Sequence, residues 1–478
     1  MEARNIFKNL SPLDHRYYLS NRDLFESLSN YLSEEAVVRY CLKVEIALLK
    51  MHVKMNVSDY HTYDDVLDKL ESEITPEEVY LEEEKTRHNL RALVNVIKRK
   101  IPAGISNYVH LGATSVDILD TAQALRMRDA VRKVVIPLLT ELLEEIIEIS
   151  DREAETPQVG RTHGQHAVPV TLGFSFAEFT ARLGKSILEL EKLSANLRGK
   201  FAGAVGAYNA SSLLVKDPVA FEKDFLNTLG IEPAEYSTQM VEPEYLLRML
   251  LELNVAFGII ANLADDLRHL QRTEIDELRE FFSKTQVGSS TMPQKRNPWN
   301  SEHVKSLWKA FAPRVMSFYM DQISEHQRDM SNSASMRFVA DYISGFTAAS
   351  ARMKKILASV RVDRERLKKN ITLHGDMVLA EAAYVLLSLS GDPDAHERVR
   401  KLTLSCEETG EKLVDALKRD SGIWDMICSR LEATTGADAE DFFSNPSLYR
   451  GKSVEKARML AERYRSIVKV VRGKLKNG

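Results

Sequence analysis

The stretch from Glu244 to Lys284 contains no proline, and its hydrophobic pattern constrains the fold more than any other part of the chain. A single helix of about 40 residues would be roughly 60 Å long, far longer than a usual globular helix. Steps of three and four residues between apolar positions are the period of an α-helix, so we predict a helix along the whole stretch. The apolar positions are Leu246, Leu250, Leu253, Phe257, Ile260, Leu263, Leu267, Leu270 and Leu278.

Three further segments have the same helical pattern, at residues 120–155, 172–201 and 299–325. Pro137 lies inside the first and is expected to bend it, because proline lacks the N–H that a helix interior uses. Glycine (21 of 478) and proline (14 of 478) are scarce, which disfavours an all-β chain rich in turns. We therefore predict an all-α protein whose long amphipathic helices form a bundle and bury their remaining apolar faces against other subunits.

Breaks in the helical pattern divide the chain into three predicted helical domains. A loop containing Pro102, Gly104 and Ser106 precedes the long helices, and the helical segments become shorter after Arg361. We predict an N-terminal helical domain over 1–111, a central long-helix bundle over 112–364 and a C-terminal helical domain over 365–478.

The charge of the chain excludes a general affinity for polyanions. The net charge is −4 and the pI is about 6.4, so we expect no nucleic-acid or membrane partner, although a local cationic pocket for a small anion stays open. The three cysteines are too few and too far apart for a disulfide framework, which fits a cytoplasmic protein. The N-terminus has no apolar core of a signal peptide, and no apolar run approaches the ~18 residues of a membrane span.

The segment TQVGSSTMPQKRNP at 285–298 lies between two long helical patterns. Gly288, Ser289 and Ser290 would make a mobile, hydroxyl-bearing loop, while Lys295 and Asn297 supply hydrogen-bond donors. Such a loop can close over an anionic substrate and exclude water. From composition alone, an ordinary helix–helix connector fits equally well.

This segment resembles the GSSxMPxKxNP signature of the fumarase/aspartase superfamily, whose members cleave C–N or C–O bonds by β-elimination and release fumarate. The resemblance implies a small N-terminal helical domain, a central bundle of five very long helices and a C-terminal helical domain. It also implies a homotetramer built on the bundle, with each active site assembled from three subunits.

Two other segments are similar to conserved regions of this superfamily. In GRTHGQHAVP (160–169), the resemblance implies catalytic positions for Thr162 and His163, whereas the residues alone suggest a structural or surface histidine pair and only weakly a metal site. In YVHLGATSVDILDTA (108–122), it implies that Thr114 and Ser115 bind a succinyl carboxylate. A plain helix N-cap is the alternative for these two residues.

Within the superfamily the sequence most resembles the adenylosuccinate lyase family, over most of its length. The segments that carry this resemblance are SPLDHRY (11–17), TRHNLRAL (86–93), GAVGAYNA (203–210), STQMVEP (237–243) and RDMSNSASMR (328–337). The substrate-binding positions that they imply, besides those above and Ser290, are Arg16, Tyr17, Arg87, His88, Asn89, Gln239, Arg328, Ser333 and Arg337. Arg16, Arg328 and Arg337 would suit the phosphate of a nucleotide substrate.

Two positions depart from this family's usual pattern. Asn89 follows His88 where aspartate is common, and Gln294 stands in the signature where histidine is common. Glutamine at that point is typical of argininosuccinate lyases. An argininosuccinate lyase, or another fumarate-releasing C–N lyase of the superfamily, therefore remains the alternative. A structural protein derived from such a lyase, retaining the bundle without activity, is the alternative from another class.

The resemblance implies cleavage of adenylosuccinate into AMP and fumarate, and of the succinyl-aminoimidazole-carboxamide ribotide of purine biosynthesis. Ser289 is the expected general base, His163 the general acid and His88 an auxiliary partner at the nucleotide side. Lys295 and Asn297 are expected to stabilise the negative charge that develops on the substrate carboxylate. No metal or organic cofactor is expected, because fumarate leaves without a redox change.

Overall fold

The computed structural model describes residues 4–283, 285 and 288–477 of the chain. In it the proline-free stretch forms α11 (Glu244–Leu270), a helix of 27 residues and therefore about 40 Å long. The prediction of a helix continuing beyond Leu270 is wrong. The chain turns after α11 and Leu278 enters a short strand, β5 (Leu278–Arg279), which pairs antiparallel with β6 (Arg361–Val362). Lys284, Gln286 and Val287 lie outside the described residues.

The predicted long helix over 120–155 is present and begins even earlier, because α7 (Ser115–Ala130) and α8 (Ile136–Arg152) continue through a π-helical turn, η5 (Val131–Val135). Pro137 lies in the first turn of α8. A wider π turn directly before proline accommodates the missing N–H without ending the helix. The bend expected at Pro137 is thus absorbed in a local widening of the helical turn.

The bundle consists of five long helical segments together with the C-terminal helix. Contacts join α8 to α9, α15 and α22, α11 to α9 and α12, and α12 to α15. Pro313 interrupts the segment from Trp299 to Met320 with a short 3₁₀ turn, in agreement with the cost of proline in a helix interior. Besides α7–α8 and α11, the members are α9 (Leu172–Ala195), α12 (Trp299–Phe311) with η7 (Ala312–Arg314) and α13 (Val315–Met320), α15 (Val339–Leu357) and α22 (Ser453–Asn477).

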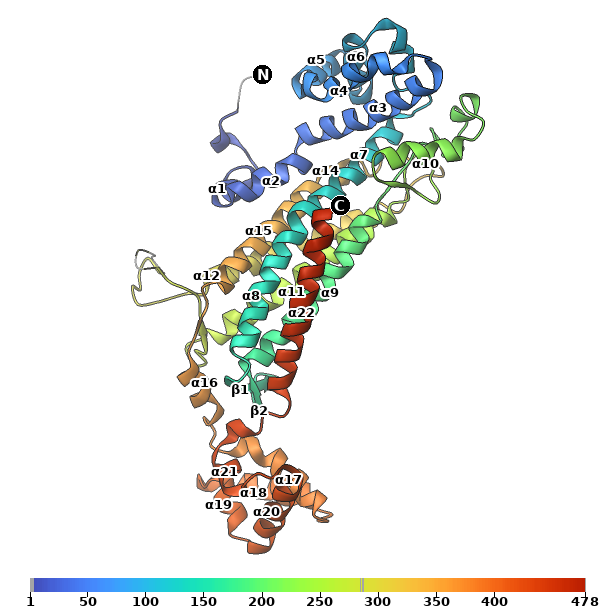
Figure 1. Cartoon of the computed structure of the whole chain (residues 1–478). Helices are drawn as coiled ribbons and strands as arrows, with labels where there is room; N and C mark the ends of the chain where they lie inside the picture. Colours follow the sequence, from blue (N-terminus) through green and yellow to red (C-terminus); the bar gives the residue numbers. More distant parts are fainter. Residues whose placement is uncertain (1–3, 284, 286–287, 478) are drawn as a thin grey trace.

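A second group of helices forms a lobe at one end of the bundle (Figure 1). Its buried residues come from the first 110 residues, from the beginning of α7 and from the segment 201–231, which includes α10. The elements of this lobe are α3 (Glu34–Asn56), η3 (Tyr60–Tyr63), α4 (Asp64–Glu73), α5 (Pro76–Thr86), α6 (Asn89–Lys100), η4 (Ala103–Tyr108), β3 (Arg198–Gly199), η6 (Ser211–Leu213), α10 (Pro218–Thr228) and β4 (Glu232–Pro233). Before them come η1 (Ile6–Lys8), η2 (Pro12–Asp14), α1 (Arg16–Ser20) and α2 (Arg22–Leu32). Leu13 of η2 and Leu28 of α2 are buried in the core of the bundle.

A third group of short helices lies at the opposite end of the bundle (Figure 1) and has its own cluster of buried residues between Leu379 and Phe443. Near this end lies the hairpin of β1 (Pro157–Thr162) and β2 (Gln165–Thr171). The elements of this group are α16 (Arg364–Ile371), η8 (Met377–Leu379), α17 (Ala380–Leu389), α18 (Ala395–Thr409), α19 (Leu413–Lys418), α20 (Ser421–Thr435), α21 (Ala439–Ser444) and η9 (Pro446–Leu448). The short helix α14 (Ser333–Arg337) does not belong to this group and directly precedes α15.

The fold is therefore all-α with three helical regions, of which the long bundle is the central one, as the sequence predicts. The three two-stranded sheets among the described residues are small additions. The domain limits at 111 and 364 stay a prediction. The segment 201–231 contributes to the N-terminal core, and α22 returns from the C-terminal region to pack on α8 and α9.

By length and composition α11 could cross a membrane, the one such helix among the described residues. However, 56% of its most apolar 18-residue window is buried inside the molecule, where α11 packs against α9, α12 and α15. This is the environment of a core helix in the bundle.

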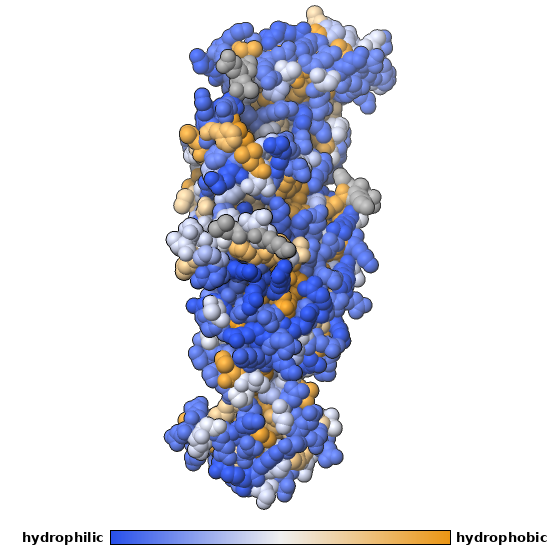
Figure 2. Space-filling view, turned by 90° about the vertical axis from the view of Figure 1, so that its left-hand side faces the viewer, coloured by the Kyte–Doolittle hydropathy of each residue, from blue (hydrophilic) through white to orange (hydrophobic). Residues whose placement is uncertain are grey.

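Large apolar side chains remain exposed along the bundle. Figure 2 shows orange areas among the hydrophilic blue ones on the face turned to the viewer. Ile323 is 84% exposed, and Val255 of α11 and Phe338 are more than half exposed. Exposed apolar side chains on bundle helices are typical of surfaces that contact other subunits.

Candidate active site

His88 and Ser115 lie together at the end of the bundle that carries the N-terminal lobe. A capping box of Thr75 and Glu78 begins α5, and Arg87 ends that helix in the left-handed conformation (φ 53°). The chain therefore turns sharply into α6, and His88 becomes its N-cap, with Nδ1 accepting the N–H of Arg91 at 3.2 Å. The other ring nitrogen, Nε2, lies 3.4 Å from Ser115 Oγ. Arg87, His88 and the neighbouring Asn89 are exposed.

Thr114 and Ser115 form the turn from which α7 begins. His110 (φ 61°) and Gly112 (φ 77°) both adopt left-handed conformations before it. A side chain at Gly112 would be strained for a second reason, because its Cβ would lie 2.7 Å from Leu214 Cδ1. Thr114 N–H donates to the carboxylate of Asp117 at 2.8 Å. A helix start with partly exposed hydroxyls and N–H groups is suited to binding a carboxylate.

The predicted residues of 237–243 and 328–337 lie near the same end. Gln239 N–H donates to Gln327 O at 3.3 Å, which joins the two segments, and Val241 N–H donates to Asp120 Oδ2 of α7 at 2.8 Å. Asn89 and Arg337 line one cavity of about 420 Å³. Ser333 and Arg337 are both exposed on α14.

Arg328 is partly buried, and one nitrogen of its guanidinium is engaged within the protein. Its backbone is left-handed (φ 81°), and Nη1 donates to Gln322 O at 3.2 Å and to Ser324 Oγ at 2.8 Å. The guanidinium therefore binds the loop that precedes it. In the structure, Arg337 rather than Arg328 presents an exposed cation beside Asn89.

A second group of predicted residues lies around α12, which Tyr17 of α1 contacts and which begins directly after the 288–298 loop. Tyr17 Oη is 3.1 Å from His303 Nε2, and the His303 ring stacks on Trp299 at a centroid distance of 5.5 Å. Burial and the nearby Arg352 both lower the pKa of His303. Arg16 precedes Tyr17 at the start of α1 and is exposed.

The hydroxyl of Ser289 accepts two backbone hydrogen bonds within its own loop. Thr291 N–H and Met292 N–H donate to Ser289 Oγ at 3.3 and 3.1 Å. Two N–H dipoles aimed at one oxygen favour negative charge on it. Asn297 Nδ2 donates to Gly288 O at 3.1 Å, which ties the two ends of the loop together.

Other side chains of the loop extend into solvent. Ser290 and Lys295 are exposed, as is Gln294. The base of the loop is held by Glu280, whose carboxylate accepts Ser301 N–H at 2.7 Å and Asn300 N–H at 3.1 Å at the start of α12. A carboxylate at a helix N-terminus is stabilised by the free N–H groups there.

Thr162 and His163 form a third group, at the tip of the β1–β2 hairpin. His163 (φ 57°) and Gly164 (φ 75°) make the tight turn between the strands. The hairpin is fastened by Glu277, which is fully buried and accepts hydrogen bonds from Arg161 and Gln158.

His166, the second histidine of this segment, lies against His374 with ring centroids 5.3 Å apart. Its Nδ1 atom is buried without a hydrogen-bond partner. Burial, followed by the charges of Arg161 and His374, lowers the pKa of His166. A histidine of this kind is favoured in its neutral form, in keeping with a supporting role.

The first and third groups do not meet within one chain. Ser115 begins and Arg152 ends a continuous helical segment, which at about 1.5 Å per residue separates the two ends by about 55 Å. Figure 1 shows the start of α7 and the β1–β2 hairpin at opposite ends of the bundle. The structure therefore brings His88 to Ser115 but leaves His163 far from both.

Several polar residues that shape these groups were not predicted. Glu277, His303 and Glu280 belong to no recognised motif. Glu277 and His303 contact Arg161 and Tyr17, which lie 116 and 286 positions away. Asp117 lies inside the YVHLGATSVD segment, so its position three residues after Thr114 was the available signal for a capping role. Among the described residues no group of three or more His, Cys, Asp or Glu side chains has the arrangement of a metal site.

Comparison with known proteins gives consistent matches along the chain. The profile of a family described as "Lyase" matches residues 16–312, and one described as "Adenylosuccinate lyase C-terminal" matches residues 324–438. Adenylosuccinate lyase from Pyrococcus abyssi is 31% identical over 414 residues, covering 86% of this chain and 90% of that protein. The enzyme of the same name from Archaeoglobus fulgidus is 31% identical over 425 residues, with the same coverage.

Solved structures have the same fold. The crystal structure of 3-carboxy-cis,cis-muconate lactonizing enzyme from Pseudomonas putida superposes with a TM-score of 0.77 at 23% sequence identity, covering 92% of this chain and 97% of that one. The fumarate lyase from Mesorhizobium gives a TM-score of 0.76 at 19% identity, with 91% and 97% coverage. At these identities the likeness concerns the fold alone.

Proposed function

The chain belongs to the adenylosuccinate lyase family, and from this we propose that it is a C–N lyase that splits adenylosuccinate into AMP and fumarate. We also propose cleavage of the succinyl-aminoimidazole-carboxamide ribotide by the same β-elimination. In each case a proton leaves the carbon beside a carboxylate, the C–N electron pair passes to the nitrogen, and a proton is returned to that nitrogen.

The observation that carries this proposal is the environment of Ser289. A serine hydroxyl is normally much too weak an acid to act as a general base. The two N–H groups of Thr291 and Met292 already point at Oγ, so they would stabilise an alkoxide at this atom. Closure of the loop over substrate would remove water and strengthen these interactions. Ser289 is therefore the proposed base.

The remaining roles follow from the charge that develops during the reaction. Deprotonation makes a carbanion whose charge spreads into the adjacent carboxylate, and Lys295 and Asn297 are proposed to stabilise it. Thr114 and Ser115, at the start of α7, are proposed to bind a carboxylate of the succinyl arm. His163 is proposed as the acid that protonates the departing nitrogen, with Thr162 beside it.

The nucleotide end is proposed to lie around α14 and the start of α6. Arg337 and Asn89 share a cavity there, and an exposed guanidinium is suited to bidentate binding of a phosphate. The other proposed contacts are Arg16, Tyr17, Arg87, His88, Gln239, Ser290, Arg328 and Ser333.

A homotetramer is proposed as the active form, with each site shared between subunits. The helical segment of about 55 Å from Ser115 to Arg152, with the hairpin at its far end, supports this, because one chain cannot bring both to a single substrate. Exposed apolar side chains on the bundle, such as Val255, supply surface for the contacts. We propose a cytoplasmic enzyme that requires no metal or organic cofactor.

A panel of substrates tests the proposal and separates the alternatives. The purified protein should convert adenylosuccinate to AMP, measured by the change in ultraviolet absorbance. Turnover of argininosuccinate instead would favour an argininosuccinate lyase, the alternative that Gln294 suggests. Inactivity on both, and on aspartate, would favour a structural protein derived from such a lyase.

A substitution of the base tests the mechanism. Ser289→Ala should lower kcat by about 10²–10⁴-fold or more while substrate binding persists, because general acid–base groups contribute on this scale. Thr291→Ala is the control, since its backbone N–H remains. Near-normal turnover by Ser289→Ala would exclude Ser289 as the base.

A further inference from the structure

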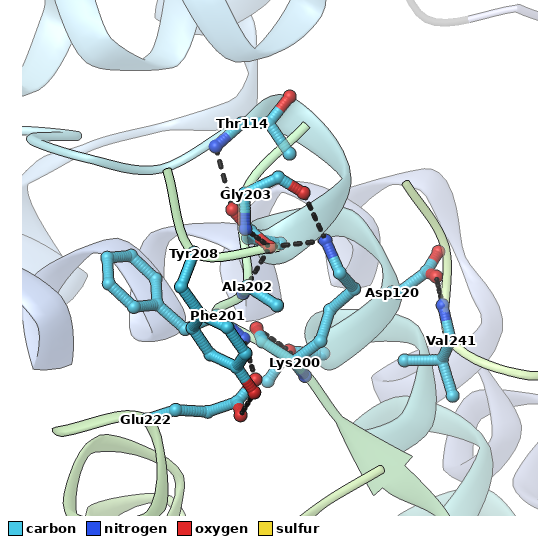
Figure 3. A network of polar contacts seen from close by, with 11 residues as sticks. Thr114, Asp120, Lys200, Phe201, Ala202, Gly203, Tyr208, Glu222 and Val241 are labelled. Carbon is cyan, nitrogen blue, oxygen red and sulfur yellow. Dashed lines mark hydrogen bonds and ion pairs between the residues drawn. The ribbon is translucent and has the colours of Figure 1, made fainter. Parts of the chain in front are cut away.

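A lysine with no exposed side-chain surface lies beneath the turn of Thr114 and Ser115. Lys200 Nζ donates to Gly203 O at 3.1 Å (Figure 3) and to Asp117 Oδ1 at 2.5 Å. The side chain of Asp117 is equally buried. Removing two charges from water is costly unless both are well paired. The mechanism described above uses neither side chain, so the pair needs another explanation.

Asp117 is the junction between two segments. Its Oδ2 accepts Thr114 N–H at 2.8 Å, while Oδ1 accepts Ala202 N–H at 3.1 Å and Gly203 N–H at 3.2 Å, besides the ammonium of Lys200. One carboxylate therefore joins the first turn of α7 to the chain that follows β3. Every donor that surrounds it also fixes its orientation.

The backbone of Lys200 is itself fixed to α7. Lys200 N–H donates to Thr121 Oγ1 at 3.0 Å, and the Thr121 hydroxyl lies 3.2 Å from Lys200 O. The preceding Gly199 leaves no room for a side chain, because a Cβ there would lie 2.8 Å from Leu226 and 2.9 Å from Thr121. The ammonium is consequently held at one place relative to the start of α7.

Neighbouring carboxyl groups have their own donors. Glu222 accepts Phe201 N–H and the Tyr208 hydroxyl, both at 2.6 Å, and Asp120 accepts Val241 N–H (Figure 3). Lys200 is thus the cation in direct contact with Asp117 among the described residues. Without it, the negative charge of Asp117 would lie uncompensated directly under the turn.

We propose that Lys200 is a positioning residue which, through Asp117, holds the turn of Thr114 and Ser115 in the geometry that binds a carboxylate of the substrate. This inference rests on the proposed function, because the ligand is the succinyl arm. Lys200 acts in two ways. It orients the carboxylate that holds Thr114 N–H, and it cancels a charge that would repel the dianionic arm.

Inhibition by the two separate products tests the proposal. In Lys200→Met, KM for adenylosuccinate and the inhibition constant of fumarate should each rise by about tenfold or more, because the charge of Asp117 is no longer cancelled beneath the turn that binds the carboxylate. The inhibition constant of AMP should stay within about twofold, because AMP has no succinyl carboxylate for the turn of Thr114 and Ser115 to bind. An unchanged constant for fumarate would overturn the proposal. Failure of the wild-type enzyme to cleave adenylosuccinate would instead contradict the proposed function.

A second variant and a control exclude general damage to the fold. Asp117→Asn should weaken the binding of fumarate, but not that of AMP, as Lys200→Met does. If Lys200→Met does not fold, the result for Asp117→Asn tests the proposal instead. Asp376→Asn is the matched control, because Asp376 is a buried carboxylate that accepts Leu413 N–H and Val414 N–H at the start of α19, in the C-terminal region. It should change neither inhibition constant. Equal loss of fumarate and AMP binding in Lys200→Met and Asp117→Asn would mean a merely structural role and overturn the proposal.

A double variant tests the electrostatic part. Lys200→Met combined with Asp117→Asn removes both charges, so fumarate should bind better than to Lys200→Met alone. Equal or weaker binding of fumarate by the double variant would refute the repulsion described above.

Discussion

Mixing two inactive variants tests whether catalytic segments from different subunits form one site. His88 lies 3.4 Å from Ser115 at one end of the bundle, whereas His163 lies at the tip of the hairpin near the other end. The helical segment between Ser115 and Arg152 spans about 55 Å, so no substrate of nucleotide size can touch both groups in one chain. A complete site must then take His88 and His163 from different chains.

The expected recovery follows from counting. His88→Ala and His163→Ala should each be nearly inactive as separate homotetramers. When equal amounts are dissociated and reassembled at random, a site receives an intact His88 with a probability of one half and an intact His163 with the same probability. About a quarter of all sites should be complete, so the mixture should regain about 25% of wild-type activity.

The assay is adenylosuccinate cleavage before and after subunit exchange, with hybrids verified through two different affinity tags. His88→Ala mixed with Ser115→Ala is the control. His88 and Ser115 of one chain lie together, so every site takes both residues from the same chain and always contains one of the two substitutions. That mixture should regain no activity. If verified hybrids of His88→Ala and His163→Ala stayed as inactive as the separate variants, the shared site would be refuted.

Three further predictions concern single residues. Arg337→Ala should raise KM for the phosphorylated substrate about 10- to 100-fold with a smaller effect on kcat, and an unchanged KM would exclude the phosphate contact. Burial raises the pKa of Asp120 to about 7, so between about pH 4 and about pH 7 the folded chain retains a proton that the unfolded chain releases. The free energy of unfolding should therefore fall by up to about 4 kcal/mol as the pH rises through this range. The melting temperature of Asp120→Asn should therefore fall less between about pH 5 and about pH 8 than that of the wild type, and parallel curves would contradict this. Glu277→Gln should destabilise the hairpin by up to about 3–5 kcal/mol and lower kcat through His163, which thermal melting and steady-state kinetics would detect.

Local pattern was sufficient for much of the fold. The three- and four-residue period located the bundle helices, and Pro137 and Pro313 coincide with a π turn and a break. The period failed after Leu270, where Leu278 continues the apolar pattern but belongs to a strand. Glu277 is buried there against Arg161, a partner 116 residues away, and a local pattern contains no information about such a partner.

The candidate site was predicted in parts rather than as an arrangement. The motifs selected His88, Ser115, His163 and Ser289, and the assignment of roles to them stays a proposal. Their grouping came from the structure, which joins His88 to Ser115 and separates both from His163. It also gave Arg328 a contact with its own loop that its spacing from Arg337 did not indicate.

The order of residues along this chain determined its helical character and the chemical groups that its motifs carry, because helix formation and motif chemistry depend on neighbours a few positions apart. Only the tertiary structure decided where α11 ends, which side chains share an end of the bundle, and that Lys200 lies buried against Asp117. These outcomes depend on contacts between residues far beyond one helical turn, such as His88 and Ser115 at 27 positions and Lys200 and Asp117 at 83. A buried charge is stable only if its partner is folded against it.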